Sequence, residues 1–154
     1  MIPRNEINDK SETRSKILAA KEEKGMTFSD IADQVGGDKT FLASATYDAA
    51  SMTKDDAMAF AEVLDLGSDV VEELQKPPMK GQGEPTIPSD PCLYRFYEVP
   101  QVYGPAMKAL IHEEFGDGIM SAIDFEVSVD KEPHPEGDHV VITYDGKFLP
   151  YKRW

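Results

Sequence analysis

The chain has 154 residues and a mass of 17.1 kDa, a size that suits one medium domain or two small ones. Hydrophobic residues make up 40% and charged residues 29%, a composition that predicts a packed core and excludes a disordered chain. The formal net charge of -13 means that the average surface repels nucleic-acid phosphates and anionic lipid headgroups. An anionic ligand would therefore need a local cationic site.

Nothing in the sequence resembles a membrane span or a targeting segment. No apolar run approaches the about 18 residues that a span needs, and residues 1–16 are polar and contain acids, unlike a signal or transit peptide. The single cysteine, Cys92, cannot form an intrachain disulfide, and we interpret it as a small apolar residue in a reducing compartment. We expect a soluble cytoplasmic protein with no membrane partner.

The first half of the chain has a helical pattern. Apolar spacing and capping residues predict five short helices, over residues 10–24, 28–35, 39–48, 54–64 and 69–75. The predicted N-caps are Asp9, Thr27, Asp38, Thr53 and Ser68, and Gly25 and Gly36 are the predicted ends of the first two helices. The prediction is a five-helix bundle over residues 1–75, which contains a repressor-like helix-turn-helix.

Residues 26–47 have the outline of a helix-turn-helix, in which the second helix would enter a DNA major groove. The charge argues against this role. Residues 1–78 hold 9 Lys or Arg against 16 Asp or Glu, and the candidate recognition helix offers only Lys39 against Asp38. Because so few phosphate contacts give DNA binding little driving force, we predict a structural bundle without a nucleic-acid partner. A DNA-binding regulator with a C-terminal dimerisation domain stays open as the alternative function.

Residues 76–91 are rich in proline, with five of the eleven prolines of the chain. Each proline fixes its own φ and moves the preceding residue out of the helical region. The sequence therefore predicts an extended linker over residues 76–91 and a second domain over residues 92–154.

The second domain begins with a predicted helix, capped by Asp90 and Pro91 and ending at Gly116. Pro100 and Pro105 lie inside it. Each removes a backbone donor and clashes with the carbonyl four residues earlier, so we expect a kink near residue 100. The element is predicted to be one bent helix or two abutting helices, the second starting at Gly104-Pro105.

A strand pattern follows, because apolar and polar residues alternate over residues 119–130, with Ser121 interrupting the apolar face. A polar loop over residues 131–138 leads to a second strand over residues 139–144, and Asp145-Gly146 then predicts a tight turn. Since two strands rarely form a stable sheet alone, we expect the hairpin to interlock with a second subunit. The predicted fold class is α+β.

Few residues indicate chemistry by themselves. In PCLYRFYEVPQ, residues 91–101, Arg95 and Glu98 are one helical turn apart among aromatic side chains. They could form a surface ion pair worth about 0.2–0.5 kcal/mol, lie over aromatic surface, or bind an anion. Ser121 could bond to backbone or serve a ligand. The three histidines, at 112, 134 and 139, lack metal-ligand spacing, and no nucleotide-binding or hydrolase signature occurs, so no metal is predicted.

Four segments at fixed spacing resemble the cyanase family, also called cyanate hydratase or cyanate lyase. They are YRFYE at 94–98, QVYG at 101–104, KALIHEEFGDGIMSAIDF at 108–125 and DGKFLP at 145–150. The resemblance implies bicarbonate-dependent decomposition of cyanate to carbamate and carbon dioxide, after which carbamate gives ammonia and more carbon dioxide. It implies bicarbonate as co-substrate, no metal or organic cofactor, and a homodecamer built as a pentamer of dimers.

The resemblance also implies the site, with Arg95, Glu98 and Ser121 as catalytic residues and Arg95, Ser121, Ala122 and Ile123 as substrate-binding residues. An arginine suits anions because its planar group donates paired hydrogen bonds and stays charged. The hydroxyl and N–H groups of residues 121–123 would orient cyanate. We expect Glu98 to orient Arg95, with proton transfer as the alternative. A purely structural oligomer is a third possibility, in which these residues could change without functional cost.

Overall fold

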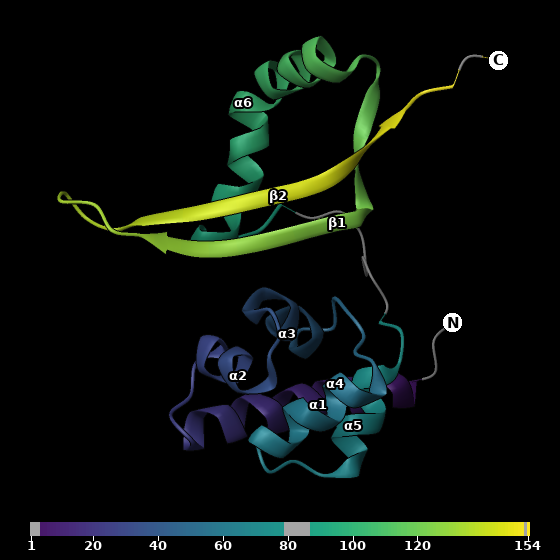
Figure 1. Cartoon of the computed structure of the whole chain (residues 1–154), viewed down its shortest axis with the longest axis vertical. Coiled ribbons are helices and arrows are strands. Elements are labelled where there is room, and N and C mark those ends of the chain that lie inside the picture. Colours follow the sequence, from purple (N-terminus) through teal and green to yellow (C-terminus); the bar gives the residue numbers. More distant parts are fainter. Residues whose placement is uncertain (1–3, 79–86, 153) are drawn as a thin grey trace. The chain divides into compact units, whose positions relative to one another are not determined.

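The computed structural model describes residues 4–78, 87–152 and 154. The chain forms two compact units, residues 1–82 and 83–154 (Figure 1). The boundary falls inside the segment for which the sequence predicts a linker, and residues 79–86 of that segment lie outside the described residues. In the described chain the first unit holds helices α1–α5, and the second holds helix α6 and strands β1 and β2.

The first unit is a bundle of short helices. Their bounds are α1 Arg4–Glu23, α2 Phe28–Val35, α3 Lys39–Thr46, α4 Lys54–Val63 and α5 Ser68–Gln75. The start predicted for the first helix is wrong, because α1 already includes Asp9, the predicted cap. A capping pattern ends a helix only where the backbone leaves helical geometry, and residues 4–9 contain no proline or glycine to impose that.

The caps of the bundle follow the sequence in most places. At α2 the Thr27 hydroxyl accepts from the Asp30 N–H at 3.1 Å, and the Thr27 N–H donates to the Asp30 carboxylate at 2.7 Å. Gly36 ends the helix with φ of 77°, a left-handed conformation that glycine adopts without strain. The other N-caps that form as predicted are Asp38 and Thr53. Ser68, like Asp9, does not form the predicted cap, because it is the first residue of α5 and Gly67 occupies the cap position.

The hydrophobic core of the first unit lies between its helices. Helix α2 packs against α3 and α4, and α5 packs against α4 and α1. The most deeply buried apolar side chains are Ile17, Ile31, Leu42, Ala57, Phe60, Ala61, Leu64 and Val70. Burying them supplies the main stabilisation of helices that are too short to be stable alone.

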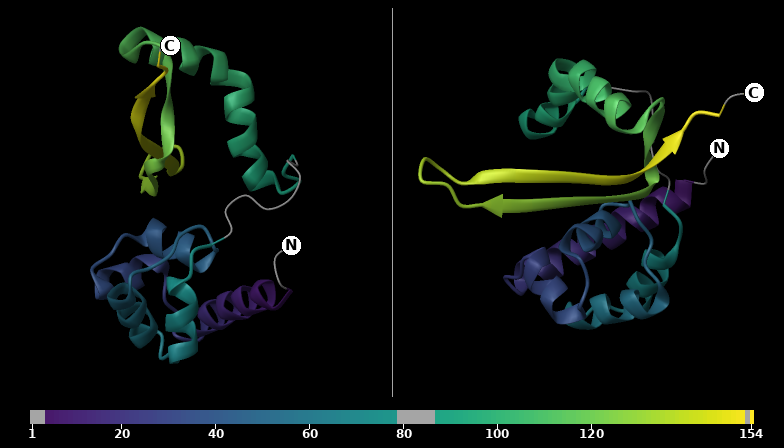
Figure 2. Two further views of the ribbon diagram at one scale, coloured as in Figure 1. Left: turned by 90° about the vertical axis from the view of Figure 1, so that its right-hand side faces the viewer. Right: turned by 45° about the horizontal axis from the view of Figure 1, so that its top comes forward.

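Helix α6, Pro91–Phe115, opens the second unit. The Asp90 carboxylate caps it by accepting from the N–H groups of Cys92 and Leu93, both at 2.9 Å. Pro100 and Pro105 lie inside the helix. Figure 1 and the left view of Figure 2 show that its axis changes direction part-way along. The element is therefore one bent helix, as internal prolines predict.

Strands β1, Gly118–Glu132, and β2, His139–Pro150, form an antiparallel hairpin. The tight turn predicted at Asp145-Gly146 is wrong, because both residues lie within β2, paired with Glu126 and Phe125. The register shifts between Met120, opposite Phe148, and Phe125, opposite Gly146. The four residues 121–124 of β1 thus face Lys147 alone and form an extended bulge.

The second unit has no core of its own. Among its described residues no hydrophobic side chain is buried, and α6 contains no buried residue. Large apolar side chains are instead exposed along α6 and both strands, among them Leu93, Phe96, Val102, Leu110, Phe115, Ile119, Val129 and Val140.

Candidate active site

The cationic half of the candidate site lies near the start of α6, one turn after the Asp90 cap. Arg95 and Glu98 are three residues apart and so face the same side of the helix. The Arg95 Nη1 group donates to Glu98 Oε2, and the two side chains are 65% and 39% exposed. The ion pair is therefore open to solvent in a single chain.

Aromatic surface lies beside this ion pair. The Arg95 guanidinium carbon is 5.7 Å from the centre of the Tyr94 ring, and the Tyr94 and Tyr97 ring centres are 6.2 Å apart. The guanidinium has five N–H donors, and within the described residues its hydrogen bonding is confined to Glu98 through Nη1. The remaining donors can bind an anion.

The second half of the candidate site is the bulge of β1. Ser121 is only 5% exposed, and its Oγ accepts hydrogen bonds from the N–H groups of Ile123 at 3.1 Å and Asp124 at 3.0 Å. These bonds satisfy two donors that a bulged strand would leave unpaired. Ala122 is exposed, and Ile123 is 98% exposed at the outside of the bulge.

The structure joins only some of the predicted site residues within one chain. Arg95 contacts Glu98, and Ser121 contacts Ile123, but no hydrogen bond or ion pair between described residues links the two groups. The Ile123 N–H, predicted to face substrate, donates to Ser121 Oγ in this chain. The site as predicted is thus present as two separate halves.

Comparison with known proteins identifies the family. Residues 10–78 match the family described as cyanate hydratase, N-terminal, and residues 85–153 match the cyanate lyase C-terminal domain. The chain is 54% identical over 144 residues to a cyanate hydratase of Acaryochloris marina, covering 94% of this chain and 98% of that one. It is 51% identical over 140 residues to a cyanate hydratase of Synechocystis, with 91% and 93% covered.

A solved structure gives the same answer. The crystal structure of cyanase from T. urticae superposes with a TM-score of 0.79 at 36% identity, covering 90% of this chain and 96% of that chain. The chain belongs to the cyanate hydratase family. The predicted α+β fold, a helical bundle followed by a helix and a hairpin, is confirmed, and none of these matches supports the DNA-binding alternative.

Sequence reasoning missed two residues of this cyanate hydratase family member that lie at the bulge. Lys147 is the single residue that faces it, and its Nζ lies 3.8 Å from the Asp124 carboxylate. Gly146 lies beside Met120 and the Ser121 carbonyl. Both belong to DGKFLP at 145–150. The Asp-Gly pair predicted a turn there, so the sequence did not predict that the two residues lie inside a strand.

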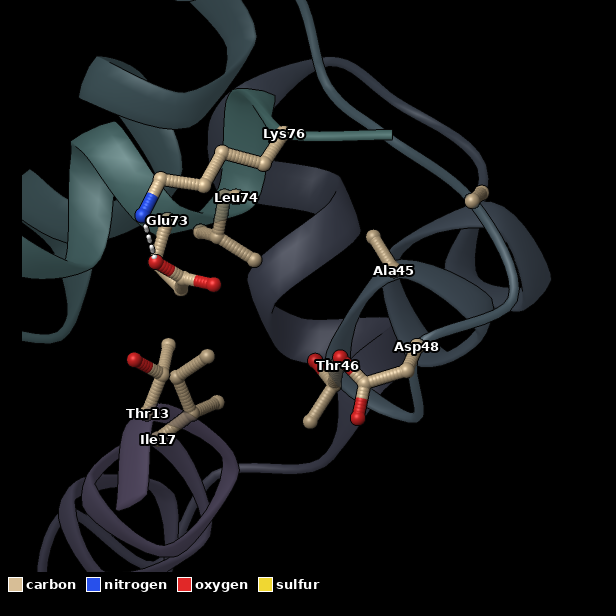
Figure 3. A pocket seen from close by; sticks show the side chains of 9 residues that line it. Thr13, Ile17, Ala45, Thr46, Asp48, Glu73, Leu74 and Lys76 are labelled. Atoms are coloured by element: carbon tan, nitrogen blue, oxygen red, sulfur yellow. Dashed lines mark hydrogen bonds and ion pairs between the residues drawn. The ribbon is translucent and has the colours of Figure 1, made fainter. Parts of the chain in front are cut away.

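A small pocket in the helical unit is a separate feature. It lies among α1, α3 and the end of α5, where the buried Glu73 carboxylate pairs with Lys76 Nζ (Figure 3). Thr13, Ile17 and Thr46 are among its other lining residues. Its volume of about 10 Å³ has room for roughly one water molecule. The pocket is too small to hold a molecule larger than water.

Two of the three histidines contact each other in the part of the chain that is described. At the tip of the hairpin, the rings of His134 and His139 stack with their centres 4.5 Å apart, and His134 Nδ1 accepts from the Glu136 N–H at 3.2 Å. No group of three or more His, Cys, Asp or Glu side chains among the described residues could hold a metal ion.

None of the described helices is both long enough and apolar enough to cross a membrane.

Proposed function

We propose that this protein is a cyanate hydratase, a carbon–nitrogen lyase that decomposes cyanate with bicarbonate as co-substrate. Bicarbonate and cyanate, with one proton, give carbamate and carbon dioxide. Carbamate then takes up a second proton and gives ammonia and another carbon dioxide. The membership of the whole chain in the cyanate hydratase family supports the reaction, and the exposed Arg95–Glu98 ion pair is the structural observation that carries its assignment to residues.

The central difficulty of this reaction is charge. Both substrates are monoanions, and two such charges about 4 Å apart repel by about 4 kcal/mol at an effective dielectric constant near 20. The protein adds to this difficulty, because its formal net charge is -13. A fixed cation with several hydrogen-bond donors offsets the repulsion. The Arg95 guanidinium supplies the positive charge, and its free N–H groups supply the donors.

Glu98 serves Arg95 in this scheme. A carboxylate would otherwise repel the substrates, but the hydrogen bond from Arg95 Nη1 keeps the two charges together. Because Arg95 and Glu98 lie on consecutive turns of one helix, the bond restricts the rotamers of the long arginine side chain. The guanidinium is then held ready to receive the anions without a large loss of side-chain entropy.

Ser121 supplies a hydrogen-bond donor on the other side of the substrates. Its oxygen accepts from two backbone N–H groups, so its proton is left to donate, and accepting hydrogen bonds makes a hydroxyl a stronger donor. No side-chain base hydrogen-bonds to Ser121 within the described residues. We therefore assign it to binding and orienting cyanate, with Ala122 and Ile123 beside it, rather than to nucleophilic attack.

In the proposed reaction, a bicarbonate oxygen adds to the cyanate carbon and a new carbon–oxygen bond forms. The bond between that oxygen and the original bicarbonate carbon then breaks, which releases carbon dioxide. The nitrogen of the former cyanate takes up two protons in all, one from the bicarbonate hydroxyl and one from solvent. Arg95 neutralises the charge of the joined anions and Ser121 holds the cyanate end. No step uses a metal ion or an organic cofactor.

The proposal includes a homodecamer, built as a pentamer of dimers in which the hairpins interlock. The second unit supports this, because its apolar side chains lack a core and an apolar groove of about 420 Å³ lies between α6 and β1. Assembly would bring Arg95 and Glu98 of some subunits to Ser121 of others. We also place the enzyme in the cytoplasm, where the exposed free Cys92 would stay reduced.

The proposal is tested by ammonia release from cyanate, with and without added bicarbonate, for the wild type and Arg95→Lys. We expect release to depend on bicarbonate. Lysine keeps the charge but loses the paired donors, so kcat/KM should fall by roughly ten- to hundredfold, equivalent to about 1.5–3 kcal/mol.

Arg14→Lys is the matched control for that substitution. Arg14 lies in the helical unit, with Nη1 3.8 Å from the Asp48 carboxylate, and the same change there should leave kcat/KM within twofold of wild type. Ammonia release that ignores bicarbonate, or an Arg95→Lys enzyme as active as Arg14→Lys, would contradict the proposed mechanism.

A further inference from the structure

The bulge that presents Ser121 is unusually long. Between the pairs Met120–Phe148 and Phe125–Gly146, four residues of β1 face one residue of β2. An ordinary bulge places two residues opposite one. The extra backbone has to be accommodated beside β2, next to Gly146 and Lys147.

Gly146 is the residue that leaves this space. A Cβ atom added there would lie 2.4 Å from Met120 Cγ and 2.6 Å from the Ser121 carbonyl oxygen. Both distances are far inside van der Waals contact, so a side chain and the two existing groups cannot coexist. Met120 could move by rotating its flexible side chain, but the carbonyl of Ser121 moves only if the backbone of the bulge moves.

We propose that Gly146 is a positioning residue for Ser121, acting through the backbone of the bulge. This inference rests on the function proposed above, because it gives Ser121 a role in binding cyanate. Gly146 touches no substrate in this scheme. Its missing side chain lets the Ser121 carbonyl approach β2, and this approach sets where the Ser121 residue begins its turn.

The turn that starts at Ser121 then fixes the direction of the Ser121 hydroxyl. Because Ser121 Oγ accepts from the N–H groups of Ile123 and Asp124, its direction is coupled to the backbone of both residues. Moving the Ser121 carbonyl would lengthen these two hydrogen bonds and turn the hydroxyl proton away from cyanate. Lys147 holds the far end of the same bulge through Asp124 at 3.8 Å, but both side chains are exposed, so we expect its contribution to be small.

The first test measures geometry without activity. Hydrogen–deuterium exchange of the assembled protein, read by mass spectrometry on a peptide containing residues 121–125, reports the N–H groups of Ile123 and Asp124. Gly146→Ala should speed their exchange at least tenfold. Gly37→Ala is the matched control, because a Cβ there meets only ordinary contacts, 3.6 Å from Val35 Cγ2, and exchange should not change. Unchanged exchange in Gly146→Ala would overturn the inference.

The second test asks whether Gly146 acts through Ser121. With kcat/KM for cyanate as the readout, Gly146→Ala should lower the value at least tenfold in the wild-type background and less than threefold in a Ser121→Ala background. Residues that act through one another give such non-additive effects, whereas a general loss of structure costs the same in both backgrounds. Equal losses in the two backgrounds would overturn the positioning role.

Two further outcomes keep the inference separate from the proposed function. If Ser121→Ala is fully active, the function assigned to Ser121 fails, and the exchange measurement still decides whether Gly146 positions it. If Gly146→Ala does not assemble, Met120→Ala is added to remove the side-chain clash and leave the clash with the carbonyl. Failure of that double variant to assemble would show that the glycine supports the hairpin as a whole, and the specific role would be overturned.

Discussion

Glu98 shows how one residue can be unfavourable by charge and still belong to an anion site. Its carboxylate adds to the negative charge of the protein, but its described partner is Arg95. In a single chain this exposed pair is worth only about 0.2–0.5 kcal/mol. Its value in the proposed site is therefore the orientation of the guanidinium, which becomes important once the substrates replace water.

This view predicts a moderate effect for Glu98→Gln. Glutamine keeps a neutral acceptor for Arg95 and loses the charge-assisted part of the bond, a difference of about 1 kcal/mol, so kcat/KM should fall roughly fivefold. Glu98→Ala removes the acceptor and should be clearly less active than Glu98→Gln. Steady-state ammonia release with both variants, together with light scattering to confirm equal assembly, measures the difference.

The opposite result would identify a proton-transfer role for Glu98. If Glu98→Gln is inactive while fully assembled, and Glu98→Ala is no worse, then the ionisable oxygen itself is required.

At the scale of secondary structure, the sequence was informative where the deciding contacts are local. Thr27 and Asp30, or Asp90 and Leu93, are three residues apart, so the caps that they form could be predicted from spacing alone. The turn predicted at Asp145-Gly146 is wrong because the contacts that decide this region are made with residues far away in the sequence. Met120 and Ser121 lie against Gly146 and leave no room for a side chain there. Sequence spacing cannot predict that contact, because it depends on how the two strands pair.

In the candidate site, too, the sequence predicted the local contacts and not the distant ones. Helix spacing predicted that Arg95 and Glu98 would meet, and they do. It left open whether Arg95 binds an anion, and only the family resemblance connected it to Ser121. The backbone donors on Ser121 Oγ could not be predicted, because they depend on four residues of β1 facing Lys147 alone.

An ion-pair network between helices of the first unit predicts a pH-dependent stability. Lys16 Nζ lies 2.8 Å from the Asp69 carboxylate of α5 and 2.9 Å from that of Glu12 in α1. Hydrogen bonding with Asp69, and then with Glu12, raises the pKa of Lys16, and the bond from Lys16 lowers the pKa of Asp69. Because the folded pKa of Asp69 is depressed, its contribution to stability is present above the ordinary carboxylate range and is lost as pH falls through its folded pKa.

We therefore expect Lys16→Met to lower Tm by a few degrees at pH 7, and the difference from wild type to shrink as the pH falls from about 5 to 3. Circular dichroism at 222 nm on the full chain measures both melting curves. Lys54→Met, which removes the same charge at the start of α4, is the matched control and should show no such trend. A wild-type minus Lys16→Met difference that stays constant down to pH 3 would contradict the linkage.

At the scale of the whole molecule, the two units pose different folding problems. The first buries Ile17, Ile31, Phe60 and other apolar side chains, whereas the described part of the second buries none. A two-stranded hairpin with an uncovered apolar helix is at best marginally stable in water. We therefore expect other chains to cover the second unit, and such an assembly would also bring the separate halves of the candidate site together.

Because the described part of the second unit lacks a core of its own, we expect the protein to assemble into a decamer. Ten chains of 17.1 kDa give a species of about 171 kDa, which light scattering after size exclusion would detect. Leu110 is 61% exposed on α6 in the single chain, and we expect such an assembly to cover it, so that Leu110→Asp would bury an unpaired charge. We expect Leu110→Asp to reduce the measured mass and ammonia release together, since Arg95 and Ser121 would no longer meet. Met58→Asp, at a residue that is 51% exposed in the helical unit, should keep both at wild-type level. A 17.1 kDa wild-type species that decomposes cyanate would show instead that one chain completes the site.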